Sequence, residues 1–423
     1  MPNNRSGTAG AVIKRHITAR VLEALGDTPV VLLNGPRQAG KSTLAQEVAS
    51  HEHPARYLTL DDATTLAAAR NDPQGFLAGF VGPVVIDEIQ RAPELFLAIK
   101  TQVDRDRRPG RFLLTGSADV LLLPNLAESL AGRMEILTLW PFSQGEIKKN
   151  QEDFIDSVFS RTIPRKQYPR LKWADMIQKI LRGGYPEILG RQTESRQAAW
   201  FGSYITTILQ RDVRDITHIE GLTALPRLFA LLAARAASLV NFSEISRTST
   251  IPQSTLKRYM TILEITFLLQ TLPAWSGNLS KRLVKAPKLV IGDTGLMTYL
   301  LGLNEERLLH DPILAGHVLE NFVIMELKKQ LGWNRIKAQL FHFRTQTGQE
   351  VDIVLEDLSG QVVGIEVKSS ASVAADDFKG LRLLHETIGK RFVRGIVLYA
   401  GSEFIPFGSE LQAFPVSALW GGV

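Results

Sequence analysis

Runs of continuous apolar residues alternate with helical periodicity in the first third of the chain. Apolar runs over 30–33, 83–86 and 111–115 have the length of buried strands, and an amphipathic pattern over 93–103 lies between the last two. Strands that are apolar throughout are typical of a parallel sheet covered by helices on both faces. The pattern therefore predicts an α/β domain over about 11–144.

The pattern changes twice further along the chain. Residues 150–170 are polar and contain Pro164 and Pro169, which predicts a linker or surface excursion, and the pattern is then helical to about Gln270. A helix over 313–330 comes next, followed by three short strands separated by turns at 347–348 and 358–360. We therefore expect an α/β domain over 1–150, a helical lid or linker over 151–220, a winged-helix-like domain over 221–310 and a second α/β domain over 311–423.

Composition limits the class of protein. With 44% hydrophobic and 22% charged residues, the chain resembles neither a disordered nor a membrane protein. The longest apolar run, 228–240, is interrupted by Arg235, and the N-terminal residues lack the pattern of a signal peptide. We expect a cytoplasmic protein without a membrane partner. The absence of cysteine excludes disulfides, cysteine nucleophiles and thiolate metal sites.

The net charge of +6 is unevenly distributed. Residues 1–150 carry +1, residues 151–310 carry +7 and residues 311–423 carry −2. A basic middle region favours a polyanionic partner, although a charge of this size also serves solubility, and both interpretations stay open.

A phosphate-binding motif lies between the first predicted strand and the helix after it. The residues from Gly35 to Ser42 match G-x-x-x-x-G-K-[ST], in which glycines let backbone N–H groups approach phosphate oxygens. Lys41 would neutralise the β- and γ-phosphates, and Ser42 would bind Mg²⁺. The pattern predicts an ATP site with Mg²⁺. Its residues are Gly35, Pro36, Arg37, Gln38, Ala39, Gly40, Lys41, Ser42 and Thr43.

Acidic and hydroxyl residues end the next two predicted strands. Asp87 would hold the Mg²⁺ shell, and Glu88 would polarise the attacking water as a catalytic residue together with Lys41. Thr115 or Ser117 would sense the γ-phosphate at the carboxyl edge of the sheet, unless these hydroxyls only complete a turn. Arg133 is a candidate for neutralising transition-state charge, within the chain or across an interface in a homo-oligomer, and an ordinary surface arginine is the alternative.

These motifs together resemble a large prokaryotic family of AAA+-type ATPases with a C-terminal domain of unknown function. The resemblance covers nearly the whole chain and implies a P-loop ATPase domain over 1–150, followed by a lid. It rests on the phosphate-binding motif, Leu60-Asp61-Asp62, Ile86-Asp-Glu-Ile-Gln-Arg-Ala-Pro-Glu-Leu-Phe96, Thr115-Gly-Ser117, Ser129-Leu-Ala-Gly-Arg133 and Gly183-Gly-Tyr-Pro-Glu187.

The basic middle region has the spacing of a helix-turn-helix. Helices expected over 228–237, 242–248 and 254–269 precede two β-like segments over 268–275 and 283–291, a winged-helix pattern. Phosphate contacts would come from the third helix and the wing. Such units also pack or dock proteins without touching nucleic acid, so both interpretations stay open. The candidate residues are Gln253, Lys257 and Arg258 on the helix and Lys281, Arg282, Lys285 and Lys288 on the wing.

Charged residues gather in the last predicted domain. Strand alternation places Glu366 and Lys368 on one face and Asp352 on the same side as Glu350, while Glu320 lies on the preceding helix. Carboxylates hold hard divalent cations, and a lysine beside them can position or deprotonate water during phosphodiester cleavage. Solvated salt bridges are the alternative.

The spacing Asp-x₁₃-Glu-x-Lys with its upstream helix resembles the PD-(D/E)XK nuclease fold. This resemblance implies that Asp352 and Glu366 are ligands of Mg²⁺ or Mn²⁺, that Glu320 is an auxiliary ligand and that Lys368 is catalytic. Val351 stands where the motif has proline.

The sequence as a whole predicts a Mg²⁺-dependent ATPase that binds nucleic acid, with DNA expected, and that cleaves it under the control of ATP. Two alternatives stay open. One is a signalling or scaffold ATPase whose winged-helix and inactive nuclease-like domains dock protein partners, and the other is a DNA-binding remodeller without nuclease activity.

Overall fold

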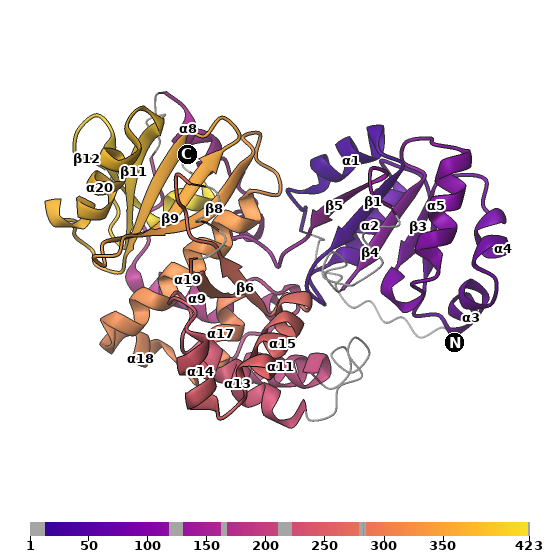
Figure 1. Cartoon of the computed structure of the whole chain (residues 1–423), viewed down its shortest axis with the longest axis horizontal. Coiled ribbons are helices and arrows are strands. Elements are labelled where there is room, and N and C mark those ends of the chain that lie inside the picture. The colour runs from indigo at the N-terminus through magenta and orange to yellow at the C-terminus, as the bar shows by residue number, and fades with distance from the viewer. Residues whose placement is uncertain are drawn as a thin grey trace, which may run out of the picture.

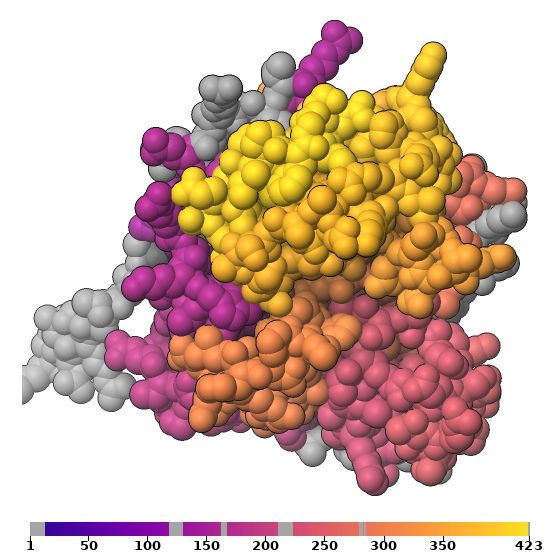
Figure 2. Space-filling view, turned by 90° about the vertical axis from the view of Figure 1, so that its left-hand side faces the viewer, coloured from indigo at the N-terminus to yellow at the C-terminus, as the bar shows by residue number. Residues whose placement is uncertain are grey.

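The computed structural model describes residues 13–117, 130–161, 167–209, 222–278, 282 and 285–421. The N-terminal α/β domain stands on the right of Figure 1, and the helical middle region lies below the C-terminal sheet on the left. Figure 2 shows the yellow C-terminal domain above the orange and pink residues that precede it in the chain. Among the described residues, no helix is both long enough and apolar enough to cross a membrane.

Five parallel strands form the sheet of the N-terminal domain, in the order β2-β3-β4-β1-β5. The three strands with continuous apolar runs were predicted. The two edge strands were not, because their half-buried residues do not form such a run. The bounds are β1 Val30–Asn34, β2 Arg56–Thr59, β3 Val84–Asp87, β4 Phe112–Gly116 and β5 Met134–Thr138.

Helices cover both faces of this sheet, as the apolar strands predicted. Val31 and Leu33 of β1 pack on α1 and α2, whereas Val30 and Leu32 face the cluster that includes α5. This alternation buries β1 on both sides and fixes the position of the loop that follows it. The bounds are α1 Thr18–Asp27, α2 Lys41–Ser50, α3 Ala63–Asn71, α4 Pro73–Ala78, η1 Ile89–Arg91 and α5 Leu95–Arg105.

Residues 150–170 were predicted to form a linker or surface excursion, and the part from 152 to 159 is neither. Phe154 and Ile155 of α8 are buried, and the Phe154 ring meets Phe414 of the C-terminal domain edge-on. The prediction was wrong because the polar residues around this short helix concealed its apolar face. The segment therefore anchors the C-terminal domain.

The middle region is helical, as the pattern predicted, and one large apolar core joins it to the C-terminal domain. Its last long helix, α15, ends at Ile265, four residues before the predicted end, and a short antiparallel pair of strands follows. The bounds are α7 Gln144–Lys148, α8 Phe154–Phe159, α9 Trp173–Arg182, α10 Pro186–Leu189, α11 Glu194–Thr207, η4 Leu222–Ala224, α13 Leu225–Ala233, α14 Phe242–Ser249, α15 Gln253–Ile265, β6 Leu269–Leu272, β7 Lys288–Ile291, α17 Thr294–Leu300 and α18 Glu305–His310.

A mixed six-stranded sheet in the order β12-β13-β11-β10-β9-β8 forms the C-terminal domain. The core around α19 includes Val363 and Ile365 of β10, and the core around α20 includes Val362, so the two helices cover opposite faces. The bounds are α19 Pro312–Gln330, β8 Ala338–Arg344, β9 Glu350–Asp357, β10 Val362–Lys368, η5 Ala375–Phe378, α20 Lys379–Ile388, η6 Gly389–Arg391, β11 Phe392–Tyr399, β12 Ile405–Pro406, β13 Leu411–Pro415 and η7 Val416–Trp420.

Backbone hydrogen bonds attach the middle region to the edge strand β8. The N–H of Trp275 donates to the carbonyl of His342 at 2.6 Å, and the N–H of His342 donates to the carbonyl of Pro273 at 2.9 Å. The His342 ring is buried here and lies 3.1 Å from the Ala286 carbonyl through Nε2. A titratable ring is therefore enclosed at this junction.

This enclosure predicts a loss of stability in acid. Burial lowers the pKa of His342 to about 4, with further lowering by the Lys288 ammonium, so the folded state binds fewer protons than the unfolded state below pH 6.5. Stability should fall by about 3 kcal/mol as the pH falls from 6.5 to 4. Urea unfolding across this range should show a smaller loss for His342→Gln, which keeps a donor for Ala286. Exposed His310→Gln is the control, and equal losses in both variants would contradict the assignment.

Candidate functional site

The predicted phosphate-binding loop connects β1 to α2 at the carboxyl edge of the parallel sheet. Gly35 has φ +144°, and a Cβ there would lie 2.1 Å from the Leu139 carbonyl oxygen, so the close approach requires glycine. Gly40, with φ +97°, is the residue before α2. The loop thus opens onto the N-terminal end of a ten-residue helix, where anions are favoured.

Protein donors hold the carbonyl groups of this loop. Lys41 Nζ donates to the carbonyls of Gly35 at 3.0 Å and Pro36 at 2.8 Å, and its side chain is buried. Arg15 donates to the Ala39 carbonyl at 2.8 Å, and the Tyr204 hydroxyl donates to the Arg37 carbonyl at 3.2 Å. The loop shape is therefore supported from α11 and from the segment before α1, which sequence reasoning missed because no local motif marks either residue. Gln38 and Thr43 are exposed.

The Asp87 carboxylate accepts hydrogen bonds from three hydroxyl groups at the same edge of the sheet. Its Oδ1 accepts from Ser42 Oγ at 2.9 Å and from Thr115 Oγ1, and its Oδ2 accepts from the Tyr57 hydroxyl at 2.8 Å. Burial and the bond to Asp87 raise the pKa of Tyr57 far above its usual value, so this hydroxyl stays a donor. A carboxylate beside a serine hydroxyl next to the phosphate loop is a donor set that fits Mg²⁺. Tyr57 had not been predicted.

Glu88 is held in a fixed orientation. Its φ of +59° lies in the left-handed region, and its N–H donates to Thr115 Oγ1 at 3.1 Å. Its carboxylate accepts from Gln90 Nε2 and, at 3.2 Å, from Ser117 Oγ. Strained backbone of this kind gathers at functional sites. The structure thus brings Lys41, Ser42, Asp87, Glu88 and Thr115 to one edge.

Arg133 lies elsewhere. It directly precedes β5, whose first residue pairs with Val30, so Arg133 is at the amino edge of the sheet, opposite the phosphate loop. Its guanidinium pairs with Asp104 at 2.5 Å and lowers the pKa of that carboxyl. The part of the prediction that placed Arg133 in the ATP site of its own chain was wrong. In a parallel sheet all strands begin at one edge and end at the other, and Arg133 precedes its strand whereas the phosphate loop follows β1. A role across a subunit interface stays a prediction.

The Gly-Gly-Tyr-Pro segment has a packing explanation. Gly183 and Gly184 lie so close to the Asp293 carboxylate and the Phe142 carbonyl that a Cβ at either would come within 2.2 Å. Tyr185 is fully buried, with its hydroxyl 2.9 Å from that of Tyr204, the residue that holds the phosphate loop. The segment therefore joins the middle region to the ATP site.

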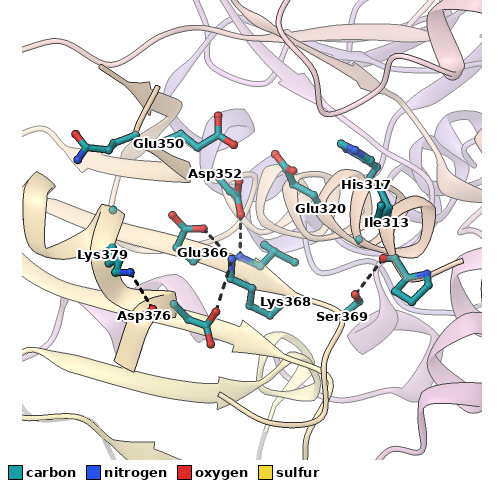
Figure 3. Close-up of a pocket in the computed structure, with 16 residues that line it drawn as sticks. Ile313, His317, Glu320, Glu350, Asp352, Glu366, Lys368, Ser369, Asp376 and Lys379 are labelled. Atoms are coloured by element: carbon teal, nitrogen blue, oxygen red, sulfur yellow. Dashed lines mark hydrogen bonds and ion pairs between the residues drawn. The ribbon is translucent and has the colours of Figure 1, made fainter. Parts of the chain in front are cut away.

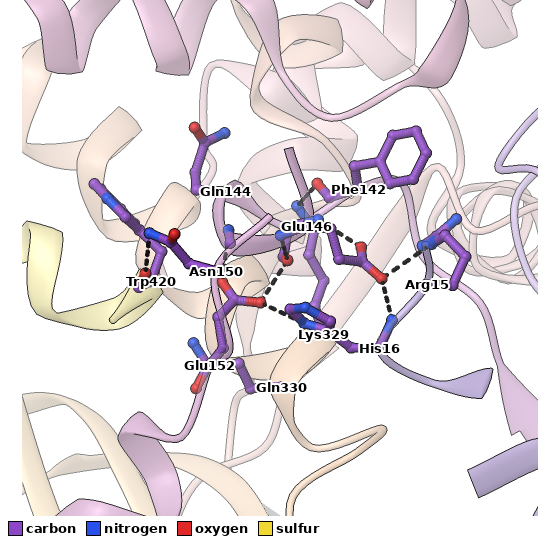
Figure 4. Close-up of polar contacts among 12 residues, drawn as sticks. Arg15, His16, Phe142, Gln144, Glu146, Asn150, Glu152, Lys329, Gln330 and Trp420 are labelled. Carbon is purple, nitrogen blue, oxygen red and sulfur yellow. Dashed lines mark hydrogen bonds and ion pairs between the residues drawn. The ribbon is translucent and has the colours of Figure 1, made fainter. Parts of the chain in front are cut away.

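A buried polar network joins the N-terminal domain to the C-terminal helix α19 (Figure 4). Glu146 accepts from Arg15 at 3.0 Å and from the His16 N–H at 2.8 Å, and it completes a capping box with Ser143. From α19, Glu326 accepts from the N–H of Gln144 at 2.8 Å. The segment from 142 to 152, which contains α7, is thus bonded to both domains.

Removing Arg15 should destabilise the whole protein. Arg15→Ala leaves the buried Glu146 without its cation and should lower the free energy of unfolding by about 3–5 kcal/mol. Arg20→Ala removes a partly exposed ion pair with Glu23 in the same region and should cost less than about 1 kcal/mol. Urea unfolding of the two full-length variants makes the comparison. If they lose equal stability, the network does not hold the domains together.

A second site lies in the C-terminal domain, where a cavity of about 470 Å³ is lined by the predicted charged residues (Figure 3). The β9–β10 ladder ends at the pair Ile353–Ile365, and the strands part immediately beyond it. Asp352 and Glu366 lie at this point. Asp352 Oδ2 accepts from the Val367 N–H at 3.0 Å, where a backbone carbonyl would accept if the strands still paired. Lys368 Nζ is 3.9 Å from the Glu366 carboxylate.

Glu320 reaches this cavity from α19, but a lysine stands between it and Asp352. Lys288 Nζ is 2.6 Å from Glu320 Oε1 and 3.3 Å from Asp352 Oδ1. Burial and the Asp352 charge raise the pKa values of Glu320 and Glu366, and the Lys288 ammonium opposes this rise at Glu320. Within the described part of the chain, no three carboxylate or histidine side chains are grouped to hold a metal. The three predicted ligands thus line one cavity, but the Lys288 ammonium already occupies the position between Glu320 and Asp352.

The residues predicted to contact nucleic acid fall into two groups in the structure: some are exposed, and others are already paired within the protein. Lys257 and Arg258 are exposed on α15, and Gln253 donates to Ser243 Oγ at 3.2 Å. Arg282 forms a two-bond ion pair with Glu356 of the C-terminal domain. The prediction that Lys288 contacts phosphates from the wing was wrong, because its side chain is only 3% exposed. Lys281 lies outside the described residues. Because Arg282 and Lys288 pair with carboxylates of the C-terminal domain, part of the +7 charge of residues 151–310 neutralises that acidic domain.

Family models match three parts of the chain. A model described as an AAA domain matches residues 27–148, a domain of unknown function (DUF8612) matches 174–307, and another domain of unknown function (DUF4143) matches 315–419. Two curated relatives match almost the whole chain: uncharacterized protein Rv2008c of Mycobacterium tuberculosis and uncharacterized protein Mb2031c of Mycobacterium bovis. Each is 32% identical over 411 residues, which cover 96% of this chain and 84% of the relative.

Two solved structures are distantly similar. A RuvB structure from Thermotoga maritima is 20% identical, with a TM-score of 0.27 over 60% of this chain and 87% of its own. The AMPPCP-bound DnaA from Aquifex aeolicus is 16% identical, with a TM-score of 0.23 over 59% of this chain and 86% of its own. TM-scores this low do not establish a shared fold.

Proposed function

This chain belongs to the family of the two mycobacterial proteins, and its N-terminal domain is an AAA-type ATPase domain. From this starting point, we propose that the protein uses ATP to act on nucleic acid. The observation that carries the proposal is the meeting of Asp352, Glu366 and Lys368 in one cavity of the C-terminal domain. Two carboxylates with a neighbouring lysine are suited to metal-dependent phosphodiester chemistry.

In the N-terminal site, the residues have separate roles. Lys41 and the loop N–H groups bind the phosphates of ATP, and Ser42 with Asp87 would hold Mg²⁺, which supplies charge neutralisation when bound. Glu88, fixed by Gln90 and Ser117, orients the attacking water and accepts its proton. Arg133, at the opposite edge of the sheet, would complete the site of an adjacent copy by exchanging its ion pair with Asp104 for a contact with the phosphates.

In the C-terminal site, Asp352 and Glu366 would hold a divalent cation, which activates water and stabilises the phosphorane charge when bound. Lys368 is 35% exposed and lies beside Glu366, so it can reach a bound phosphate. We assign it the positioning of the attacking water, and DNA is the substrate we propose.

The exposed basic residues of α14 and α15 would hold the nucleic acid. Arg247, Lys257 and Arg258 are all exposed, and α14 and α15 pack on each other across a short turn. This arrangement suits a helix that contacts phosphates beside the groove. The acidic C-terminal domain needs such a basic neighbour because its own charge repels a polyanion.

DNA affinity should therefore fall steeply with salt. The triple variant Arg247→Ala/Lys257→Ala/Arg258→Ala should make the slope of log K against log salt shallower by about 2–3, because each lost phosphate contact removes about 0.9. Fluorescence anisotropy with duplex DNA measures the slope. Arg105→Ala/Arg108→Ala, which removes exposed charges of the N-terminal domain, should leave it unchanged.

The contrary results identify the alternatives. An unchanged slope in the triple variant would exclude these helices as the contact surface. If the wild-type protein binds neither duplex nor single-stranded DNA, the scaffold function is favoured. That alternative has its own support, because Arg282 and Lys288 are already paired with carboxylates of the C-terminal domain.

A further inference from the structure

We propose that Lys288 is a built-in cation that competes with a divalent metal for two carboxylates that line the C-terminal cavity, Glu320 and Asp352. Metal then binds fully only when β7 withdraws Lys288 from these carboxylates. This inference rests on the proposed function of the cavity, and it adds a residue that comes from outside the C-terminal domain. Lys288 is the first residue of β7 in the middle region.

The contacts of Lys288 place its charge where it excludes a metal. Its ammonium lies between Glu320 at 2.6 Å and Asp352 at 3.3 Å, and the side chain is 3% exposed. Lys368 differs in that it is 35% exposed and no nearer than 3.9 Å to a carboxylate. Lys288 therefore uses carboxylate oxygens that a metal would need, whereas Lys368 stays available to a substrate.

The backbone holds Lys288 in this place. On one side Lys288 pairs with Leu272 of β6, and on the other it forms a bridge with Leu239. The Asn321 side chain both accepts from the Ile291 N–H at 2.8 Å and donates to the Ile291 carbonyl at 2.9 Å. Two consecutive residues of α19 thus hold the two ends of β7, because Glu320 pairs with Lys288 and Asn321 bonds to Ile291.

Charge makes the two cations mutually exclusive. A Mg²⁺ or Mn²⁺ ion needs about six oxygen ligands and repels an ammonium group a few ångströms away, especially in a buried site. With Lys288 in place, Glu320 is committed to an ion pair and Asp352 is partly neutralised. Because β6 follows α15 and pairs with β7, a shift of the helices that are proposed to hold nucleic acid would also move Lys288.

The experiment is a Mn²⁺ titration of full-length protein, followed by electron paramagnetic resonance. Two pairs are compared: Lys288→Met with wild type, and Lys288→Met/Glu320→Gln with Glu320→Gln. In each pair the loss of the ammonium should tighten the Asp352-dependent Mn²⁺ site on the order of tenfold or more. The second pair leaves no unpaired Glu320 charge, so it still compares the Mn²⁺ affinity with and without Lys288 even if the single variant folds poorly. Mn²⁺ should also raise the melting temperature more in the variants without Lys288.

Two controls sharpen the comparison. Lys288→Arg keeps the cation and should bind Mn²⁺ as weakly as wild type. Lys379→Met removes a cation of the cavity wall that pairs with Asp376, and it should leave Mn²⁺ binding unchanged. Asp352→Asn identifies which Mn²⁺ site is being observed.

The outcomes separate this inference from the proposed function. Tighter Mn²⁺ binding in both pairs supports the inference. Equal binding with and without Lys288, lost in both cases on Asp352→Asn, overturns the inference but leaves the metal site of the proposed function intact. If no variant binds Mn²⁺ through Asp352, the inference and the proposed metal site both fail.

Discussion

Replacing Lys41 with alanine is expected to slow ATP hydrolysis at least about a hundredfold, the effect of losing one preorganised group that stabilises transition-state charge. Lys41 is buried at the start of α2, and its ammonium is bonded to the carbonyls of Gly35 and Pro36 within the phosphate loop. Lys41 is the lysine of the phosphate-binding motif, and its ammonium is the group expected to neutralise the β- and γ-phosphates. Steady-state phosphate release by the purified variant measures the effect.

Glu88→Gln tests the chemical step separately. The amide keeps the shape of Glu88 and a hydrogen bond to Ser117, but it cannot accept a proton, so nucleotide binding should persist while turnover falls about 10²–10⁴-fold. Lys100→Ala, on α5 and paired with Asp104, is the control and should hydrolyse ATP at the wild-type rate. Undiminished hydrolysis by Lys41→Ala would remove the assignment of the phosphate loop.

Asp352→Asn and Lys368→Met are each expected to reduce metal-dependent cleavage of nucleic acid at least about a hundredfold. Asp352 lies where β9 and β10 part, and the Val367 N–H holds its carboxylate toward Glu366. Lys368 is the accessible cation of the same strand. The assay uses single-stranded, duplex and branched DNA with Mn²⁺ or Mg²⁺, each with and without ATP.

The controls come from the same cavity. Asp376→Asn changes a wall carboxylate that pairs with Lys379 and should leave cleavage unchanged. Both test variants should also keep wild-type ATP hydrolysis, because the phosphate loop lies in another domain. If the wild-type protein cuts none of these substrates in any condition, nuclease activity is excluded and the scaffold or remodeller interpretation takes its place. A response of cleavage to Lys41→Ala would show that ATP regulates it.

The phosphate loop illustrates what a sequence can predict. Gly35, Lys41 and Ser42 belong to one strand–turn–helix unit, so their spacing along the chain determines their arrangement in space. The same holds for Asp352, Glu366 and Lys368, because strand alternation and a short turn between β9 and β10 carry them to one end of neighbouring strands. Continuous apolar runs likewise predicted the inner strands of the first sheet but missed its half-buried edges, β2 and β5.

Contacts between distant segments could not be predicted in this way. Arg15 and Glu146 are separated by 131 positions, and Lys288 is separated from Glu320 by 32 and from Asp352 by 64. Each of these partners lies on a different element, so their meeting depends on how whole elements pack. Lys288 therefore appeared to be one more basic residue of an exposed wing.

The sequence by itself determined the ATP site, the α/β character of both outer domains and the residues that could form a second site, because each follows from local spacing and periodicity. Only the tertiary structure decided that Arg133 faces away from the ATP site of its own chain, that Arg15 and Tyr204 support the phosphate loop, and that Lys288 pairs with two carboxylates of the C-terminal cavity. The physical reason is that burial and packing, rather than residue type, determine whether a charge is solvated or paired.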